Sequence, residues 1–101
     1  MLAEFSIVPI GKGESLGALI AEITKIVERS RLSHKLTAMG TIVQGDWDSV
    51  MALIKKCHAR AMSNGRRVMT HINIDDRKGV RNPMAHKVES IERRLGHAVA
   101  K

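Results

Sequence analysis

The segment KLTAMGTIVQG, residues 35–45, places threonines on both sides of Ala38-Met39-Gly40, and Gln44 follows. Threonine hydroxyls and glutamine amides both donate and accept hydrogen bonds. A site for a small heterocycle needs only a few such groups on an apolar wall. Threonine also suits a strand, so the pair could equally serve cross-strand pairing alone. The segment therefore leaves two interpretations open: a ligand site and a plain hairpin.

Other residues with reactive side chains do not form a recognisable catalytic or metal site. Asp75-Asp76-Arg77 pairs two carboxylates but has no readable nucleophile with an adjacent base, so a strand-end turn is the better interpretation. The histidines and Cys57 lack metal-ligand spacing. GKGES, residues 11–15, departs from the phosphate-binding G-x-x-x-x-G-K-[ST] pattern and is interpreted as a turn. We expect no catalysis, no metal and no cofactor.

Positive charge is concentrated in the second half of the chain. Residues 55–101 carry 12 Lys/Arg against 4 Asp/Glu, whereas residues 1–54 carry 5 against 6. Such an excess can mark an anionic partner or a solvated surface. The cations are scattered, and Phe5 and Trp47 are the only aromatic residues available to stack on bases. Nucleic acid is therefore not expected as a partner, although an anion-responsive or nucleic-acid-binding regulator remains the alternative function.

The location of the protein is suggested by what its sequence lacks. The chain has one cysteine, no positively charged leader before an apolar stretch, and no apolar run approaching the roughly 20 residues of a membrane span. We expect a cytoplasmic protein without membrane insertion.

Hydrophobic periodicity predicts the elements that must position the threonines. Alternation predicts strands over 2–10 and 66–76, and short apolar segments over 34–39 and 41–45 predict a hairpin around Gly40. Apolar residues three and four apart predict helices, the first from the N-cap Ser15 to about Ser30 and the others over 47–63 and 84–95.

The order of these elements predicts an α+β fold in one domain, residues 1–101. A βαββαβ chain gives a ferredoxin-like sandwich, with two helices on one face of a four-stranded antiparallel sheet, here followed by a C-terminal helix. We expect the helices to bury the side of Phe5, Ile7, Ile72 and Ile74. The other face mixes polar and apolar residues, which is typical of a subunit interface or a ligand floor.

Nearly the whole chain resembles the small thiamine-binding protein family. The most specific element is T-x-M-G-T-x-V-x-G, matched by residues 37–45, with support from S-x-x-P at Ser6–Pro9 and from Ile74-Asp75-Asp76-Arg77. The resemblance implies a ferredoxin-like cytoplasmic protein that binds thiamine or its hydroxymethylpyrimidine part without catalysis, in vitamin supply, storage or sensing. It also implies a homodimer or homotetramer assembled through the sheets.

Within this resemblance, the expected ligand-binding residues are Ser6, Thr37, Gly40, Thr41, Gln44 and Asp75. Asp75 would accept a hydrogen bond from an amino or ammonium group. Gln44 replaces an acid common in the family, and because its amide is neutral, pyrimidine recognition is retained more easily than recognition of a cation.

Overall fold

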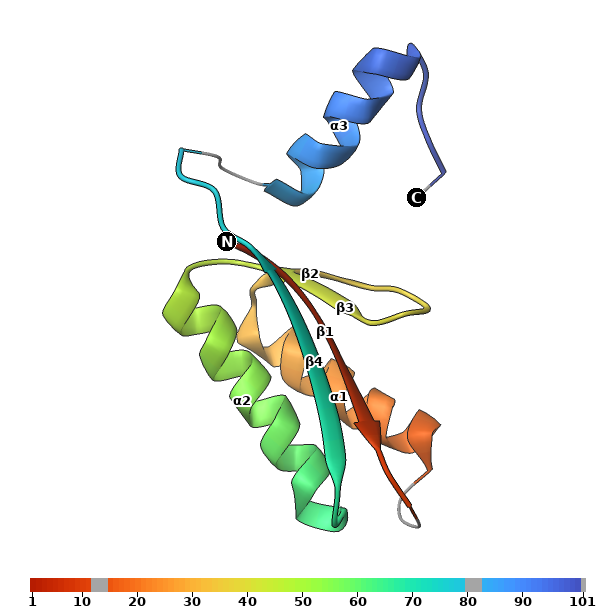
Figure 1. Ribbon diagram of the computed structural model, residues 1–101, viewed down its shortest axis with the longest axis vertical. Helices are drawn as coiled ribbons and strands as arrows, with labels where there is room; N and C mark the ends of the chain where they lie inside the picture. Colours follow the sequence, from red (N-terminus) through yellow and green to blue (C-terminus); the bar gives the residue numbers. More distant parts are fainter. Residues whose placement is uncertain (12–14, 80–82, 101) are drawn as a thin grey trace.

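The computed structural model describes residues 1–11, 15–79 and 83–100, so the predicted turn at GKGES lies largely outside the described residues. The elements in chain order are β1 (Leu2–Pro9), α1 (Leu16–Ser30), β2 (Ser33–Leu36), β3 (Thr41–Gln44), α2 (Trp47–Asn64), β4 (Val68–Asp75) and α3 (Pro83–Leu95) (Figure 1). Thr37, Ala38 and Met39 lie in the connection after β2 rather than in a strand, so the predicted first half of the hairpin is too long.

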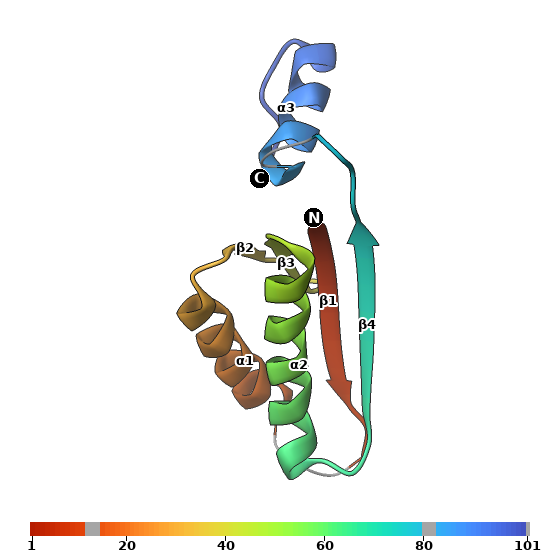
Figure 2. The ribbon, with the colours of Figure 1, turned by 90° about the vertical axis from the view of Figure 1, so that its left-hand side faces the viewer.

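The strands form one antiparallel sheet in the order β2-β3-β1-β4. Figure 2 shows α1 and α2 on one face of this sheet, with α3 beyond the end of the sheet at which the chain begins. The predicted α+β ferredoxin-like architecture is confirmed, including the additional C-terminal helix. Within the described part of the chain, no helix is long and apolar enough to cross a bilayer.

The core lies between the sheet and the two helices. Ala3, Phe5 and Ile7 alternate along β1 and are each at most 3% exposed, packed with Val43 and with the inner faces of α1 and α2. Ile72 and Ile74 pair with Phe5 and Ala3 and so lie on the same face. They are nevertheless 36% and 40% exposed. The prediction that the helices bury them is therefore wrong, because β4 is an edge strand and this part of it lies outside the packed core.

Side-chain caps define where the two packed helices begin. The amide of Ala18 donates to Ser15 Oγ at 3.2 Å, and the amide of Ser49 donates to Asp46 Oδ2 at 3.1 Å. Hydrogen bonds from Ser49 lower the pKa of Asp46 from its usual 3.8. At its other end α1 closes on Arg31, whose left-handed φ of 61° directs its amide to Glu28 O at 3.2 Å.

The third helix is attached mainly by polar contacts. It contains no buried residue, and Ile91 and Leu95 are 51% and 52% exposed. The Met84 amide donates to Gln44 Oε1 at 3.1 Å, and Lys87 forms an ion pair with Asp75. Helix α3 thus joins the sheet through its first turns, and Ile91 and Leu95 in its second half remain exposed.

Candidate ligand-binding site

A step in the sheet creates the candidate site. β1 pairs with β4 along its whole length, to Pro9 opposite Val68, but its pairing with β3 stops at Phe5 opposite Thr41. The hairpin between β2 and β3 turns back at this point. The second half of β1, from Ser6 to Pro9, therefore has an edge without a strand beside it.

The alternating direction of the peptide groups along β1 indicates which of them face that edge. Met1 pairs with Gly45 on the β3 side, through bonds of 2.8 and 3.0 Å, whereas the Ile10 amide donates to Arg67 O on the β4 side at 2.9 Å. In an antiparallel sheet both peptide groups of a residue point to one side, and the side alternates along the strand. The N–H and C=O of Ile7 therefore point toward the unpaired edge. Pro9 is the next residue whose peptide groups point to this side, and it has no N–H.

The Thr37 hydroxyl is used within the turn itself. It donates to Gly40 O at 2.8 Å and accepts from the amides of Met39 and Gly40 at 3.2 and 3.1 Å, while the Thr37 amide also donates to Gly40 O. A Cβ on Gly40 would lie 2.8 Å from Phe5 O, so only glycine lets the turn approach β1 this closely. Thr37 and Gly40 thus shape the wall, and their amide and hydroxyl groups are already bonded.

The edge of β1, the turn and α1 enclose a cavity of about 260 Å³, which we call the hairpin pocket. Apolar side chains dominate its lining, and the described lining residues carry no charge; they are Phe5, Ser6, Ile7, Val8, Leu16, Ile20, Ile23, Leu36, Thr37, Ala38, Met39, Gly40 and Thr41. Thr41 is 8% exposed, and its hydroxyl bonds to no other described residue. A ligand could use that hydroxyl, the Ile7 peptide groups and the Ser6 hydroxyl at the rim.

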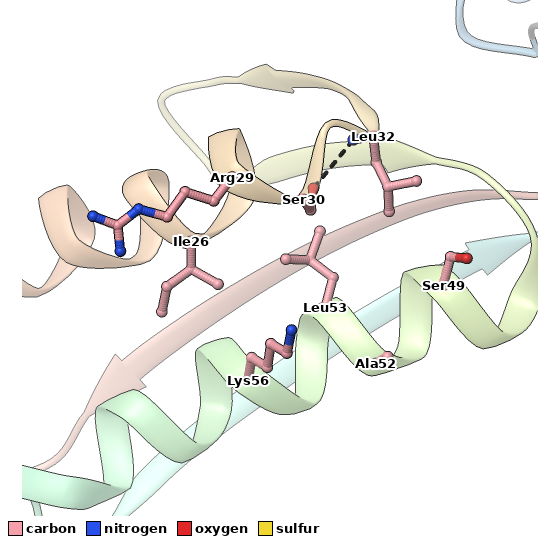
Figure 3. A pocket seen from close by; sticks show the side chains of 8 residues that line it. All are labelled: Ile26, Arg29, Ser30, Leu32, Ser49, Ala52, Leu53 and Lys56. Carbon is pink, nitrogen blue, oxygen red and sulfur yellow. Dashed lines mark hydrogen bonds between the residues drawn. The ribbon is translucent and has the colours of Figure 1, made fainter.

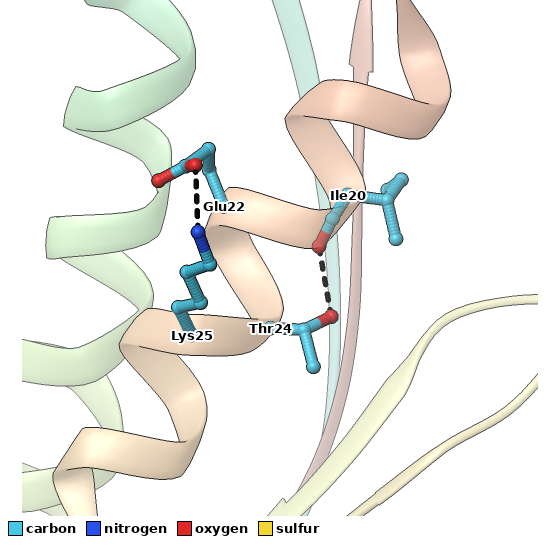
Figure 4. Close-up of polar contacts among 4 residues, drawn as sticks. All are labelled: Ile20, Glu22, Thr24 and Lys25. Carbon is cyan, nitrogen blue, oxygen red and sulfur yellow. Dashed lines mark hydrogen bonds and ion pairs between the residues drawn. The ribbon is translucent and has the colours of Figure 1, made fainter.

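Helix α1 supplies an apolar wall whose nearby polar groups are satisfied internally. The Thr24 hydroxyl donates to Ile20 O at 2.8 Å, and Lys25 pairs with Glu22 at 3.2 Å (Figure 4). Neither Thr24 nor Lys25 lines the hairpin pocket. Selectivity on this side of the cavity must therefore come from shape.

Four of the six sequence-predicted residues border this pocket, and two do not. Ser6, Thr37, Gly40 and Thr41 line the cavity, with Ser6 at the rim because it alternates with buried Phe5 and Ile7. Gln44 and Asp75 lie at the other end of the sheet, where each contacts α3. The hydrogen bond with Lys87, and then its charge, lower the pKa of Asp75 from its usual 3.8.

The sequence interpretation missed the apolar contribution of α1 and the peptide groups of Ile7. Leu16 and Leu36 line the pocket while remaining 54% and 52% exposed, and Met39 at its rim is 83% exposed. A signal for the open edge was present: the strands around Gly40 are shorter than β1, and β1 ends in a proline.

The lone thiol is not part of this site. Cys57 is fully buried on the inner face of α2, and desolvation raises its pKa to about 11. It therefore remains a protonated thiol near neutral pH, which is a poor nucleophile and a poor metal ligand. Among the described residues, no cluster of three or more His, Cys, Asp or Glu side chains could hold a metal ion.

Comparisons with known proteins place this geometry in context. A family model described as thiamine-binding protein matches residues 3–92. The UPF0045 protein of Mycobacterium bovis is 35% identical over 96 residues, which cover 94% of each chain. The UPF0045 protein of Bacillus subtilis is 32% identical over 100 residues, covering 93% of this chain and 96% of that one.

Solved structures share the fold. A hypothetical protein from Methanocaldococcus jannaschii superposes with a TM-score of 0.81 at 31% identity, covering 89% of this chain and 93% of that one. A Thermotoga maritima protein provisionally described as a thiamine biosynthesis or salvage protein superposes with a TM-score of 0.77, covering 89% of this chain and 96% of that one. Its identity is 17%, so this likeness shows the fold alone.

Proposed function

The chain belongs to the thiamine-binding protein family, and from this premise we propose that it binds thiamine or its hydroxymethylpyrimidine part in the hairpin pocket, without catalysis. The role would be vitamin supply, storage or sensing. The observation that carries the proposal is that, within the part of the chain that the structure describes, the donor and acceptor of Ile7 and the hydroxyl of Thr41 have no partner, in a cavity whose described lining residues carry no charge.

An aminopyrimidine is complementary to these groups. Its amino group donates and the adjacent ring nitrogen accepts, so the ring could continue the sheet by bonding to the C=O and N–H of Ile7. The Thr41 hydroxyl can then donate or accept at a neighbouring position. Ser6 borders this arrangement, and Thr37 and Gly40 hold the turn that closes it.

The size and charge of the pocket favour the pyrimidine over the rest of the vitamin. Its volume of about 260 Å³ lies just below the roughly 300–1,000 Å³ typical of small-molecule sites. No described lining residue is charged, so the described lining itself offers the thiazolium cation no carboxylate. We propose that the pyrimidine ring is enclosed and that the thiazolium part lies toward solvent. Gln44 and Asp75 then hold α3 rather than the ligand.

Calorimetric titration with thiamine, its phosphates and hydroxymethylpyrimidine tests the proposal. We expect thiamine and hydroxymethylpyrimidine to bind with similar affinities that change little with salt, because the recognised part is neutral. No binding of either compound would contradict the proposal. Tight DNA or RNA binding that falls steeply with salt would instead favour the regulatory alternative suggested by the basic second half.

We further propose a homodimer or homotetramer that covers the open face of the sheet. Val8 and Met69 on that face are 42% and 43% exposed, and Ile91 and Leu95 of α3 are more exposed still. Apolar area of this kind is stabilised by burial against a second copy. Light scattering should give a multiple of 11.2 kDa at micromolar concentration, and a monomer would contradict this proposal.

A further inference from the structure

A second cavity lies between the two packed helices and has a different chemistry. Its volume is about 420 Å³, and its lining comes from the last turn of α1, the first half of α2 and the segment that joins α1 to β2 (Figure 3). We call it the helix cleft. It shares no lining residue with the hairpin pocket, which uses the first half of α1.

The floor of the helix cleft is apolar and its wall is held by specific hydrogen bonds. Ile26, Leu32 and Leu53 form the floor, and Leu53 belongs to the buried core. The Leu32 amide donates to Ser30 Oγ at 3.2 Å, next to the left-handed cap at Arg31. Because this connection is fixed by backbone geometry, the cleft is formed before any ligand arrives.

Two cations from opposite helices flank this floor. Figure 3 shows Lys56 extending from α2 toward α1, whereas the Arg29 side chain runs along α1 past Ile26 and points away from Lys56. The cleft lining contains no carboxylate, and neither cation has an ion-pair partner among the described residues. An ammonium beside an apolar floor, with a guanidinium on the helix that borders it, favours an anionic head group attached to an apolar body.

We propose that the helix cleft binds a small molecule that joins an apolar body to one carboxylate or phosphate group. The apolar body lies on Ile26, Leu32 and Leu53, and the anion lies beside the Lys56 ammonium, where a rotation of the Arg29 side chain would bring its guanidinium to the same group. This site is independent of the proposed pyrimidine site, because the two cavities differ in both lining and charge.

NMR titration of the isotope-labelled full chain tests the site with three probes: 1-naphthoate, 1-naphthyl phosphate and uncharged 1-naphthalenemethanol. Comparison of the two anions distinguishes a carboxylate site from a phosphate site. We expect at least one anion to shift amides concentrated in residues 26–32 and 49–56, and to bind more tightly than the alcohol.

Two double variants that each remove two positive charges distinguish binding in the helix cleft from general attraction of an anion to a basic protein. Arg29→Gln with Lys56→Gln should weaken binding of the anion about fivefold or more. Lys25→Gln with Lys55→Gln removes two cations that do not line the cleft and should leave binding nearly unchanged. Hydroxymethylpyrimidine binding should be the same in both double variants, so failure here and failure of the proposed function are distinguishable.

The proposal is overturned if the alcohol binds as tightly as both anions, or if the two double variants lose affinity equally. It is also overturned if the shifts map to the hairpin pocket or the open face, or if neither anion binds at millimolar concentration.

Discussion

The two ends of the sheet use polar side chains in opposite ways. At the hairpin end, the Thr37 hydroxyl bonds to the carbonyl and the amide of Gly40 within the turn. A cavity lies beside this turn, along the unpaired edge of β1. At the α3 end, Gln44 and Asp75 reach across to a helix and bond to its Met84 amide and its Lys87 ammonium. Polar residues of similar appearance in the sequence thus line a cavity at one end and attach a helix at the other.

The difference between the two ends follows from the position of residues 37–45 along the sheet. Residues 37–45 run through the turn and along β3, so the motif begins at the pocket and ends at the helix attachment. Thr41 faces the helices and is buried, whereas Gln44 faces the open side of the sheet. One short motif therefore combines residues that line the cavity with a residue that attaches α3.

The largest effect should come from Gly40→Ala, which breaks the hairpin end. Its Cβ would lie 2.8 Å from the carbonyl oxygen of Phe5, so the turn must move away from β1. We expect a loss of about 1–3 kcal/mol of stability, seen as a lower melting temperature, together with loss of pyrimidine binding. Gly17→Ala meets nothing within 4 Å and is the matched control, expected to melt as the parent does or slightly higher. Equal behaviour of the two variants would contradict this account.

A smaller loss of stability should follow Thr37→Val. The amides of Met39 and Gly40 lose their shared acceptor, at a cost of about 0.5–1.5 kcal/mol, and the loosened turn weakens the binding of hydroxymethylpyrimidine. Thermal melts and titrations measure both effects. Thr24→Val removes a hydroxyl that bonds only within α1, and it should leave binding unchanged. If Thr37→Val melts and binds as the parent does, the turn bonds do not shape the pocket.

Thr41→Val should change affinity without changing stability. Its hydroxyl has no partner in the described chain, and valine keeps the shape and the strand preference of threonine. Losing one ligand hydrogen bond of about 0.5–1.5 kcal/mol weakens pyrimidine binding roughly two- to tenfold. Calorimetry and a melt on the same sample measure the two quantities. Unchanged affinity would remove Thr41 from the site.

The smallest effect concerns the α3 end and its pH dependence. The pKa of Asp75 is lowered in the folded chain, so its contribution is present above the usual value of 3.8 and is lost as the pH falls through the lowered value. We expect acidification to reduce the helical carbon shifts of residues 85–93 while those of the hairpin change less. Lys87→Gln should remove this dependence. A pH response that persists in Lys87→Gln would show that other carboxyl groups control α3.

Most of the fold could be predicted because the hydrophobic periodicity and the helix-capping residues indicate the same elements. Ser15 begins its helix as predicted, the helix predicted over 47–63 is present and is capped by Asp46, and alternation identified β1 and β4. The error at Ile72 and Ile74 arose because alternation assigns a face but does not tell how far a helix extends over an edge strand. The single domain over residues 1–101 and the cytoplasmic location remain predictions.

The site was predictable only in part. Thr41 and Gln44 are three residues apart, and a strand places such residues on opposite faces, so the sequence alone could have separated them. The Ile7 peptide groups carry no side-chain signal of their own, and the short strands around Gly40 and the proline of β1 indicate only that an edge is open. Their availability depends on the pairing of β1 with β3 ending at Phe5 and Thr41, beside the turn that the Thr37 hydroxyl holds.

The buried thiol of Cys57 allows the opening of α2 to be measured by the rate at which the thiol is modified. A reagent that modifies thiols can reach this side chain only when α2 separates from the sheet, and the chain holds no second cysteine to obscure the signal. When opening and closing are fast, the labelling rate reports the free energy of that opening. A ligand that binds only the closed chain lowers the labelling rate in proportion to its occupancy. One spectrophotometric trace for each compound can therefore rank unlabelled compounds by affinity.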